Sequence, residues 1–290
     1  MKTPEHFRAS CPTRAGHKRM EKTMTVAGMK GFRLLTEDVL TLAEALGDDD
    51  WSRPSGAEGW TVKDVFSHTG QLVSLLTAAV QGTLEYPDPP LGIEPLNNVL
   101  VGSTREQKPA AIIDFLRAQS ETAFPVFEAL QEEPLASSTA ELLDLGTYEL
   151  HAIPNMFTFD FATHLHFDLL APRGPLNVPW PLMGKDRMAP AVDWLMGGIP
   201  KMQSTLYRSL HAPVGLDLTG PASTSVVVHR VGDAIVVDDS STAPSPAAVV
   251  TSSTFDFLAW STTRIPWREV TRVTGDVSIA ASFLDELNLI

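Results

Sequence analysis

The chain has 290 residues, of which 43% are hydrophobic and 20% charged, so it is long enough to bury a core in one large or two modest domains. Its formal net charge of −13 repels phosphate backbones, and no basic patch offsets it, so we expect no nucleic-acid partner. The one cysteine, Cys11, excludes an intrachain disulfide and a multi-cysteine metal site. We expect a cytoplasmic protein without membrane contact, because no apolar run approaches the roughly 18 residues of a membrane span.

The first part of the chain predicts a tail and two helices. Residues 1–25 are partly basic and lack apolar periodicity, which predicts a frayed tail. Residues 29–46 place apolar side chains at three- and four-residue steps, the period of a helix with one buried face. Thr61 and Asp64 have the spacing of a capping box, so the next helix should begin near Val62. His68 lies on the apolar stripe of that helix and is expected to point inward.

Three more helical segments complete the predicted bundle. A linker over residues 85–104 precedes a helix that Pro109 opens and that Pro125 can kink. A fourth helix begins near Pro154, runs through His164 and stops at the Pro- and Gly-containing residues 171–175. A fifth segment covers about residues 190–210. We therefore predict that residues 26–211 form a helical bundle.

Beyond residue 211 the pattern changes to short β-branched runs bounded by Gly, Pro and Ser. The runs predict four strands, at residues 214–218, 225–229, 234–237 and 248–251. A short helix over 255–262 with Thr254 as its cap, a turn at Gly275-Asp276 and a helix over 277–289 should follow. The fold class is therefore α+β, with a smaller α/β domain over residues 212–290.

The histidines and aspartates of the bundle suggest a metal centre. Asp160 and His164 lie four residues apart on the fourth helix, so they share a face. His68 can add a third ligand from a neighbouring helix. Three ligands leave positions open for water or substrate, as in catalytic sites, and nitrogen and oxygen donors without sulfur favour zinc, with manganese, iron or nickel as alternatives.

Other interpretations of these residues remain open at this stage. A single histidine on an apolar stripe is more often a hydrogen-bonded core residue than a ligand. His166 competes with His164 for the ligand position, because both lie on the same predicted helix. Asp168, four residues after His164, is expected as an outer partner or a helix-end residue rather than as a ligand.

Two stretches, residues 59–68 (GWTVKDVFSH) and 160–169 (DFATHLHFDL), resemble the mycothiol-dependent maleylpyruvate isomerase family, whose members are DinB-like metal-binding four-helix bundles. The resemblance implies an up-and-down bundle, the ligands His68, Asp160 and His164, and a sterol-carrier-like C-terminal domain that ends in a Gly-Asp turn and a helix. The chain departs from the family pattern in two ways. Asp160 replaces a glutamate, and Asp168 follows His164 by four residues rather than three.

The same resemblance implies an isomerase or S-transferase that uses mycothiol, a low-molecular-weight thiol, with the metal favouring its thiolate form. The substrate would be a small electrophile or carboxylate. We expect Arg264 to hold a substrate carboxylate and Trp60 to line the pocket, although Arg264 as a surface residue and Trp60 as a core residue are the alternatives. Two other functions stay open: a non-catalytic protein that binds metal or a small ligand, and a metal-dependent hydrolase. The sequence is compatible with a monomer or a homodimer.

Overall fold

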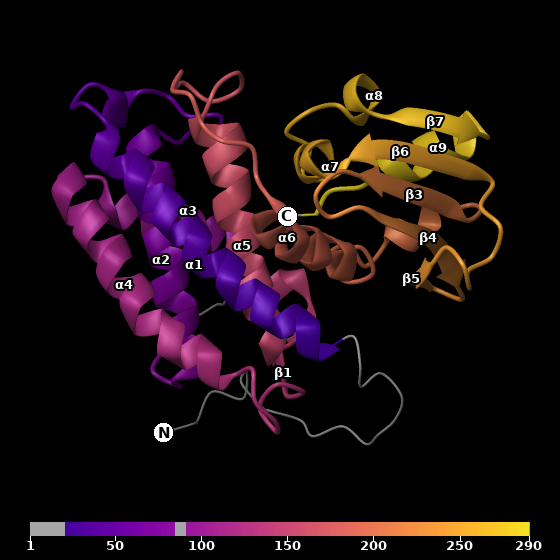
Figure 1. Ribbon diagram of the computed structural model, residues 1–290, viewed down its shortest axis with the longest axis horizontal. Helices are drawn as coiled ribbons and strands as arrows, with labels where there is room; N and C mark the ends of the chain where they lie inside the picture. Colours follow the sequence, from indigo (N-terminus) through magenta and orange to yellow (C-terminus); the bar gives the residue numbers. More distant parts are fainter. Residues whose placement is uncertain (1–20, 85–90, 290) are drawn as a thin grey trace. The chain divides into compact units, whose positions relative to one another are not determined.

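The computed structural model describes residues 21–84 and 91–289, and for residues 21–26 the backbone alone. It divides into two compact units, one ending at Pro181 and the other beginning at Leu182 (Figure 1). Most of the predicted tail, residues 1–20 with Cys11, lies outside the described residues, and the helical backbone already begins at Glu21. Among the described residues, no helix has the length and apolar content to cross a bilayer.

The first unit is a helical bundle, as the sequence predicts. The four helices that the sequence predicts here are α1 (Glu21–Ala45), α2 (Val62–Val80), α4 (Pro109–Ala129) and α5 (Ile153–Thr163). Helix α2 packs against α4, and α1 packs against α5. Phe32 of α1 is fully buried, and its ring stacks on that of Phe157 of α5 with centroids 4.5 Å apart. The apolar stripes read from the sequence therefore meet in one core.

Smaller elements of this unit were not expected from the sequence. Helix α3 (Ile93–Thr104) occupies most of the predicted linker, and residues 85–90 of that linker lie outside the described residues. A short hairpin of β1 (Thr139–Glu141) and β2 (Thr147–Glu149) precedes α5. The loop of this hairpin carries Asp144, whose side chain accepts the Ile93 N–H at the start of α3 at 2.9 Å. The group that satisfies the start of α3 thus lies far along the chain, where no local pattern reveals it.

The second unit contains a five-stranded sheet in the order β5-β4-β3-β6-β7. Its strands are β3 (Val214–Thr219), β4 (Thr224–Val231), β5 (Ala234–Asp239), β6 (Ala248–Ser253) and β7 (Arg272–Gly275). Strands β3 and β6 are parallel, and the other neighbours are antiparallel. The four predicted strands are confirmed, whereas the sequence does not predict β7. The helices of this unit are α6 (Lys185–Gly198), α7 (Thr254–Ser261), α8 (Trp267–Val270) and α9 (Val277–Leu284).

The turn predicted at Gly275-Asp276 is present and has a steric reason. Gly275 has φ +84°, and a Cβ atom there would lie 2.4 Å from the Ala247 carbonyl oxygen, so no larger residue fits. Asp276 then caps α9 by accepting the Ser278 and Ile279 N–H groups. Helix α7 is capped by Ser253 rather than by the expected Thr254. The predicted α+β class, a helical bundle followed by a smaller α/β domain, is confirmed.

The division between the units lies some thirty residues earlier than the sequence pattern suggests. The sequence pattern places this boundary near residue 212, where helical periodicity gives way to β-branched runs. Helix α6, however, contacts α7 and belongs to the second unit, which begins at Leu182. An amphipathic helix has the same sequence pattern whichever domain it packs on, so its pattern alone could not assign it.

Candidate metal centre

Helix α2 carries His68 into the interior of the bundle. The Thr61 side chain accepts the Asp64 N–H and the Asp64 carboxylate accepts the Thr61 N–H, which completes the predicted capping box and fixes where the helix begins. His68 follows two helical turns later and is 3% exposed, on the same buried face as Leu72. The local sequence thus determines both the start of this helix and the inward direction of the imidazole.

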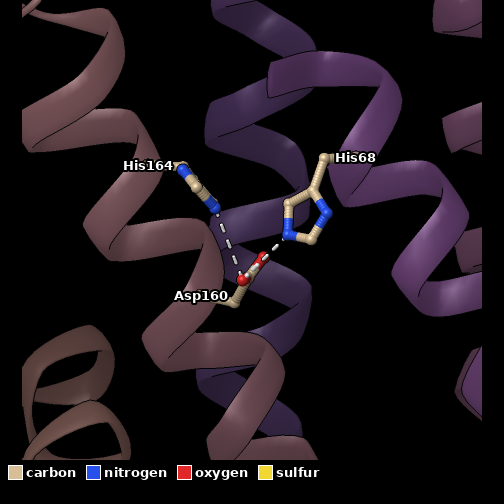
Figure 2. Close-up of side chains that lie close together, drawn as sticks. All are labelled: His68, Asp160 and His164. Atoms are coloured by element: carbon tan, nitrogen blue, oxygen red, sulfur yellow. Dashed lines mark hydrogen bonds and ion pairs between the residues drawn. The ribbon is translucent and has the colours of Figure 1, made fainter. Parts of the chain in front are cut away.

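Helix α5 supplies the other two predicted residues. Asp160 and His164 lie one turn apart and face α2, as predicted (Figure 2). His164 is the first residue of η4 (His164–Leu169), a π-helical turn that continues α5. The two side chains are 15% and 10% exposed, so all three groups lie in a largely water-excluded part of the bundle.

The three side chains converge on a common point. Asp160 Oδ1 lies 3.2 Å from His68 Nε2 and 3.5 Å from His164 Nε2 (Figure 2). One ligand atom from each residue lies within 4.8 Å of the others. Donors about 2.0–2.1 Å from a tetrahedral zinc ion are about 3.4 Å from one another, so these distances suit a shared cation. Two neutral imidazoles and one carboxylate also form a donor set that zinc accepts.

Trp60 forms one wall of this cluster. Its ring centroid lies 5.0 Å from that of His68 and 6.1 Å from that of His164. The indole Nε1–H donates to Asn98 Oδ1 of α3 at 2.9 Å, which holds the ring in place. Sequence reasoning missed Asn98, because the helix that carries it was not predicted.

Asp168 is an outer partner of the cluster rather than a member of it. Its carboxylate is fully buried, and Oδ2 lies 2.8 Å from His164 Nδ1. Because an ionised carboxylate can only accept, Nδ1–H of His164 is the donor to Asp168, and Nε2 is the ring nitrogen that faces Asp160 Oδ1. Arg173 donates from Nη1 to the other carboxylate oxygen, Oδ1.

The pairing of His164 with Asp168 lies within the π-helical turn. Asp168 follows His164 by four residues in this turn, and its Oδ2 lies 2.8 Å from His164 Nδ1. The geometry favours His164 over His166 as the ligand, because His166 is not part of the three-residue cluster.

Arg264 lies in the second unit, three residues after the end of α7, and is half-buried. Its backbone N–H donates to the Ala259 carbonyl at 2.9 Å. Its predicted role toward a substrate carboxylate therefore stays a prediction, whereas Trp60, His68, Asp160 and His164 lie together within the first unit.

Together the fold and this cluster define a helical bundle with a His/Asp/His constellation of the kind that holds a divalent cation, followed by an α/β domain. Residues 32–151 match the family model of the mycothiol maleylpyruvate isomerase N-terminal domain. The resemblance drawn from the sequence is therefore confirmed. The match includes His68 and ends before Asp160 and His164.

Solved structures extend the likeness to both units. The crystal structure of the mycothiol-dependent maleylpyruvate isomerase aligns with a TM-score of 0.56 and 16% identity, covering 87% of this chain and 94% of that one. A histidine-to-alanine mutant of the same enzyme aligns equally well at 15% identity. At such identities the alignments establish a shared fold. The solution structure of sterol carrier protein domain 2 of Helicoverpa armigera also aligns, over 28% of this chain with a TM-score of 0.24. No curated protein sequence matches the chain.

Proposed function

We propose that this protein is a metal-dependent enzyme of the mycothiol-dependent maleylpyruvate isomerase type, acting on a small electrophile with a low-molecular-weight thiol. In the isomerisation, the sulfur adds to a cis double bond, the resulting single bond rotates, and elimination of the same thiol leaves the trans product. The observation that carries the proposal is the convergence of His68, Asp160 and His164 at distances that suit one cation.

The ligands would be the two Nε2 atoms and Asp160 Oδ1. A divalent cation bound there, with zinc favoured by the nitrogen and oxygen donors, would stabilise a thiolate over a thiol at neutral pH. The Asp160 carboxylate would offset part of the cation's charge, and the imidazoles of His68 and His164 would add no charge of their own as neutral ligands. Three protein ligands would leave room for an incoming thiol or substrate group.

The surrounding residues would exclude water and orient the reactants. Trp60, fixed by Asn98, covers one side of the imidazoles with an apolar ring. A substrate carboxylate needs a cationic partner, and we assign this role to Arg264 of the second unit. The resemblance noted in the sequence motivates this assignment. Arg264→Ala should then raise KM for a carboxylate substrate while the bound metal content stays the same.

Elemental analysis combined with a thiol-dependence assay tests the proposal. Purified wild-type protein should contain about one equivalent of metal, His68→Ala should contain little, and His211→Ala, a change at an exposed histidine, should match the wild type. Turnover of maleylpyruvate should require added mycothiol. Metal-free wild-type protein would overturn the proposal, whereas turnover without any thiol would favour the hydrolase, for which the open position activates water.

A further inference from the structure

Two segments far apart in the sequence are joined beside His164. The Gly56 N–H donates to the Asp168 carbonyl oxygen at 2.8 Å. Arg173 donates from Nη1 to the Asp168 carboxylate and to the Phe167 carbonyl oxygen, the latter at 3.3 Å. We call Gly56, Asp168 and Arg173 the clamp. It connects the segment that leads into α2, and hence toward His68, with the π turn that carries His164.

The clamp is closely packed around Gly56. A Cβ atom at this position would lie 2.6 Å from Arg173 Nη1, 2.7 Å from the Phe167 carbonyl oxygen and 2.9 Å from Asp168 Cα. Two of these three atoms are backbone atoms, so the structure could accommodate a side chain here only by moving the main chain. The guanidinium can reach Asp168 only because position 56 has no side chain.

Charge explains why Arg173 is needed there. The Asp168 side chain is 0% exposed, so its charge requires partners for both oxygens. Oδ2 accepts a hydrogen bond from His164 Nδ1–H, and Oδ1 accepts one from Arg173 Nη1–H. With Oδ1 engaged by a cation, the carboxylate plane is fixed, and Oδ2 is held toward the imidazole.

We propose that Arg173 is a positioning residue of the metal centre: acting through Asp168, it fixes the tautomer and ring orientation of His164, and Gly56 supplies the space that this requires. The inference rests on the proposed function in taking His164 as a ligand. The hydrogen bonds of Arg173 Nη1 run to Asp168 and to the Phe167 carbonyl oxygen, so its link to His164 passes through Asp168.

Zinc affinity in a double-mutant cycle tests the proposal. Zinc would be titrated against a chromophoric chelator into metal-free wild type, Arg173→Ala, Asp168→Asn and the double variant. We expect each single variant to bind zinc about 10- to 100-fold more weakly, the usual loss for an outer partner of a histidine ligand. The double variant should lose no more than Asp168→Asn alone, because Arg173 acts through Asp168. Losses that multiply, or an Arg173→Ala variant that binds zinc like the wild type, would overturn the proposal.

Matched variants separate positioning from general destabilisation. Arg173→Lys keeps the charge and should recover part of the affinity, which also covers the case in which Arg173→Ala fails to fold. Gly56→Ala should weaken zinc binding by displacing the guanidinium, whereas Gly102→Ala, where a Cβ atom meets nothing within 4 Å, should not. Arg117→Ala removes a half-exposed arginine paired with Glu44 and should leave zinc affinity unchanged. Equal zinc affinity of Gly56→Ala and Gly102→Ala would contradict the role given to Gly56.

A second measurement needs no metal. The ¹⁵N-resolved imidazole spectra of metal-free protein should show His164 Nδ1–H in a fixed hydrogen bond to Asp168 in the wild type, and this signal should weaken in Arg173→Ala. An unchanged signal would overturn the positioning role. If the wild type binds no zinc but the signal differs between wild type and Arg173→Ala, the proposed function fails while the orienting role of Arg173 stands, so the two failures can be told apart.

Discussion

The two helices that supply histidines to the cluster are built in different ways. Helix α2 is regular, begins at a capping box made of Thr61 and Asp64, and presents His68 by its helical period alone. Helix α5 has no side-chain cap and passes into a π turn at His164. The orientation of His164 depends on Asp168 and, through it, on Arg173. One histidine is thus placed by helical period alone. The other depends on side-chain contacts around the π turn, to which the Gly56 N–H adds one hydrogen bond from a distant segment.

This difference indicates where the site tolerates change. A regular helix with satisfied termini is robust, because each residue is supported by its neighbours in sequence. A π turn loses α-helical hydrogen bonds and needs other contacts to persist, and such turns are frequent at functional sites. We therefore expect the His164 side of the cluster to be the sensitive one.

The largest expected effect is the loss of zinc affinity when either histidine is removed, and it should be similar for His68 and His164. If both histidines are ligands, His164→Ala and His68→Ala should each reduce zinc affinity by more than the roughly 100-fold that loss of an outer partner can cost. Competition with a chromophoric chelator measures both. An affinity of His164→Ala close to that of the wild type would remove this residue from the ligand set and reopen the choice of His166.

A second prediction compares two aspartates. Asp168 has two donors, whereas Asp193 of α6 lies half-buried in the second unit, and burial raises its pKa to about 6. Its carboxyl in the unfolded chain ionises near 3.8, so the native state is favoured below that pH and loses this contribution as the pH rises through about 6. Asp193→Asn should therefore stabilise the protein at pH 7.5 by up to about 3 kcal/mol.

Urea unfolding at two pH values measures this effect. At about pH 3.5, where the carboxyl is protonated in both states, wild type and Asp193→Asn should differ little. The same gain at both pH values would show that the benefit comes from packing and not from ionisation. Zinc affinity should not change, because Asp193 lies in the other unit.

A smaller effect is expected from the cap of α2. Thr61→Ala removes the hydroxyl that accepts the Asp64 N–H and should reduce the free energy of unfolding by about 1 kcal/mol, within the usual range for lost N-caps. Zinc affinity should change little, since His68 lies two turns further along a regular helix. A large loss of zinc affinity would show that the placement of His68 by α2 is as sensitive to change as that of His164 by the π turn.

The smallest effect is expected at His166. This residue lies in the π turn but outside the three-residue cluster, so His166→Ala should bind zinc like the wild type. Its metal content, measured beside that of His164→Ala, checks the assignment. A metal-free His166→Ala variant would show that the turn presents a different histidine in solution.

Local patterns in the sequence were sufficient for much of this molecule. The capping box fixed the start of α2, the apolar periods located the long helices of the bundle, and the β-branched runs located four strands, because each depends on neighbours a few residues away. The spacing of Asp160 and His164, together with the inward face of His68, also predicted which three side chains meet.

Only the tertiary structure decided the remaining features. Helix α3 begins where Asp144 caps it, β7 (Arg272–Gly275) is defined by its pairing with β6, and α6 belongs to the unit whose helix α7 it contacts. The clamp likewise includes the hydrogen bond from the Gly56 N–H to the Asp168 carbonyl oxygen. In each case the partner lies far away along the chain, so the deciding hydrogen bond or contact exists only once the chain has folded.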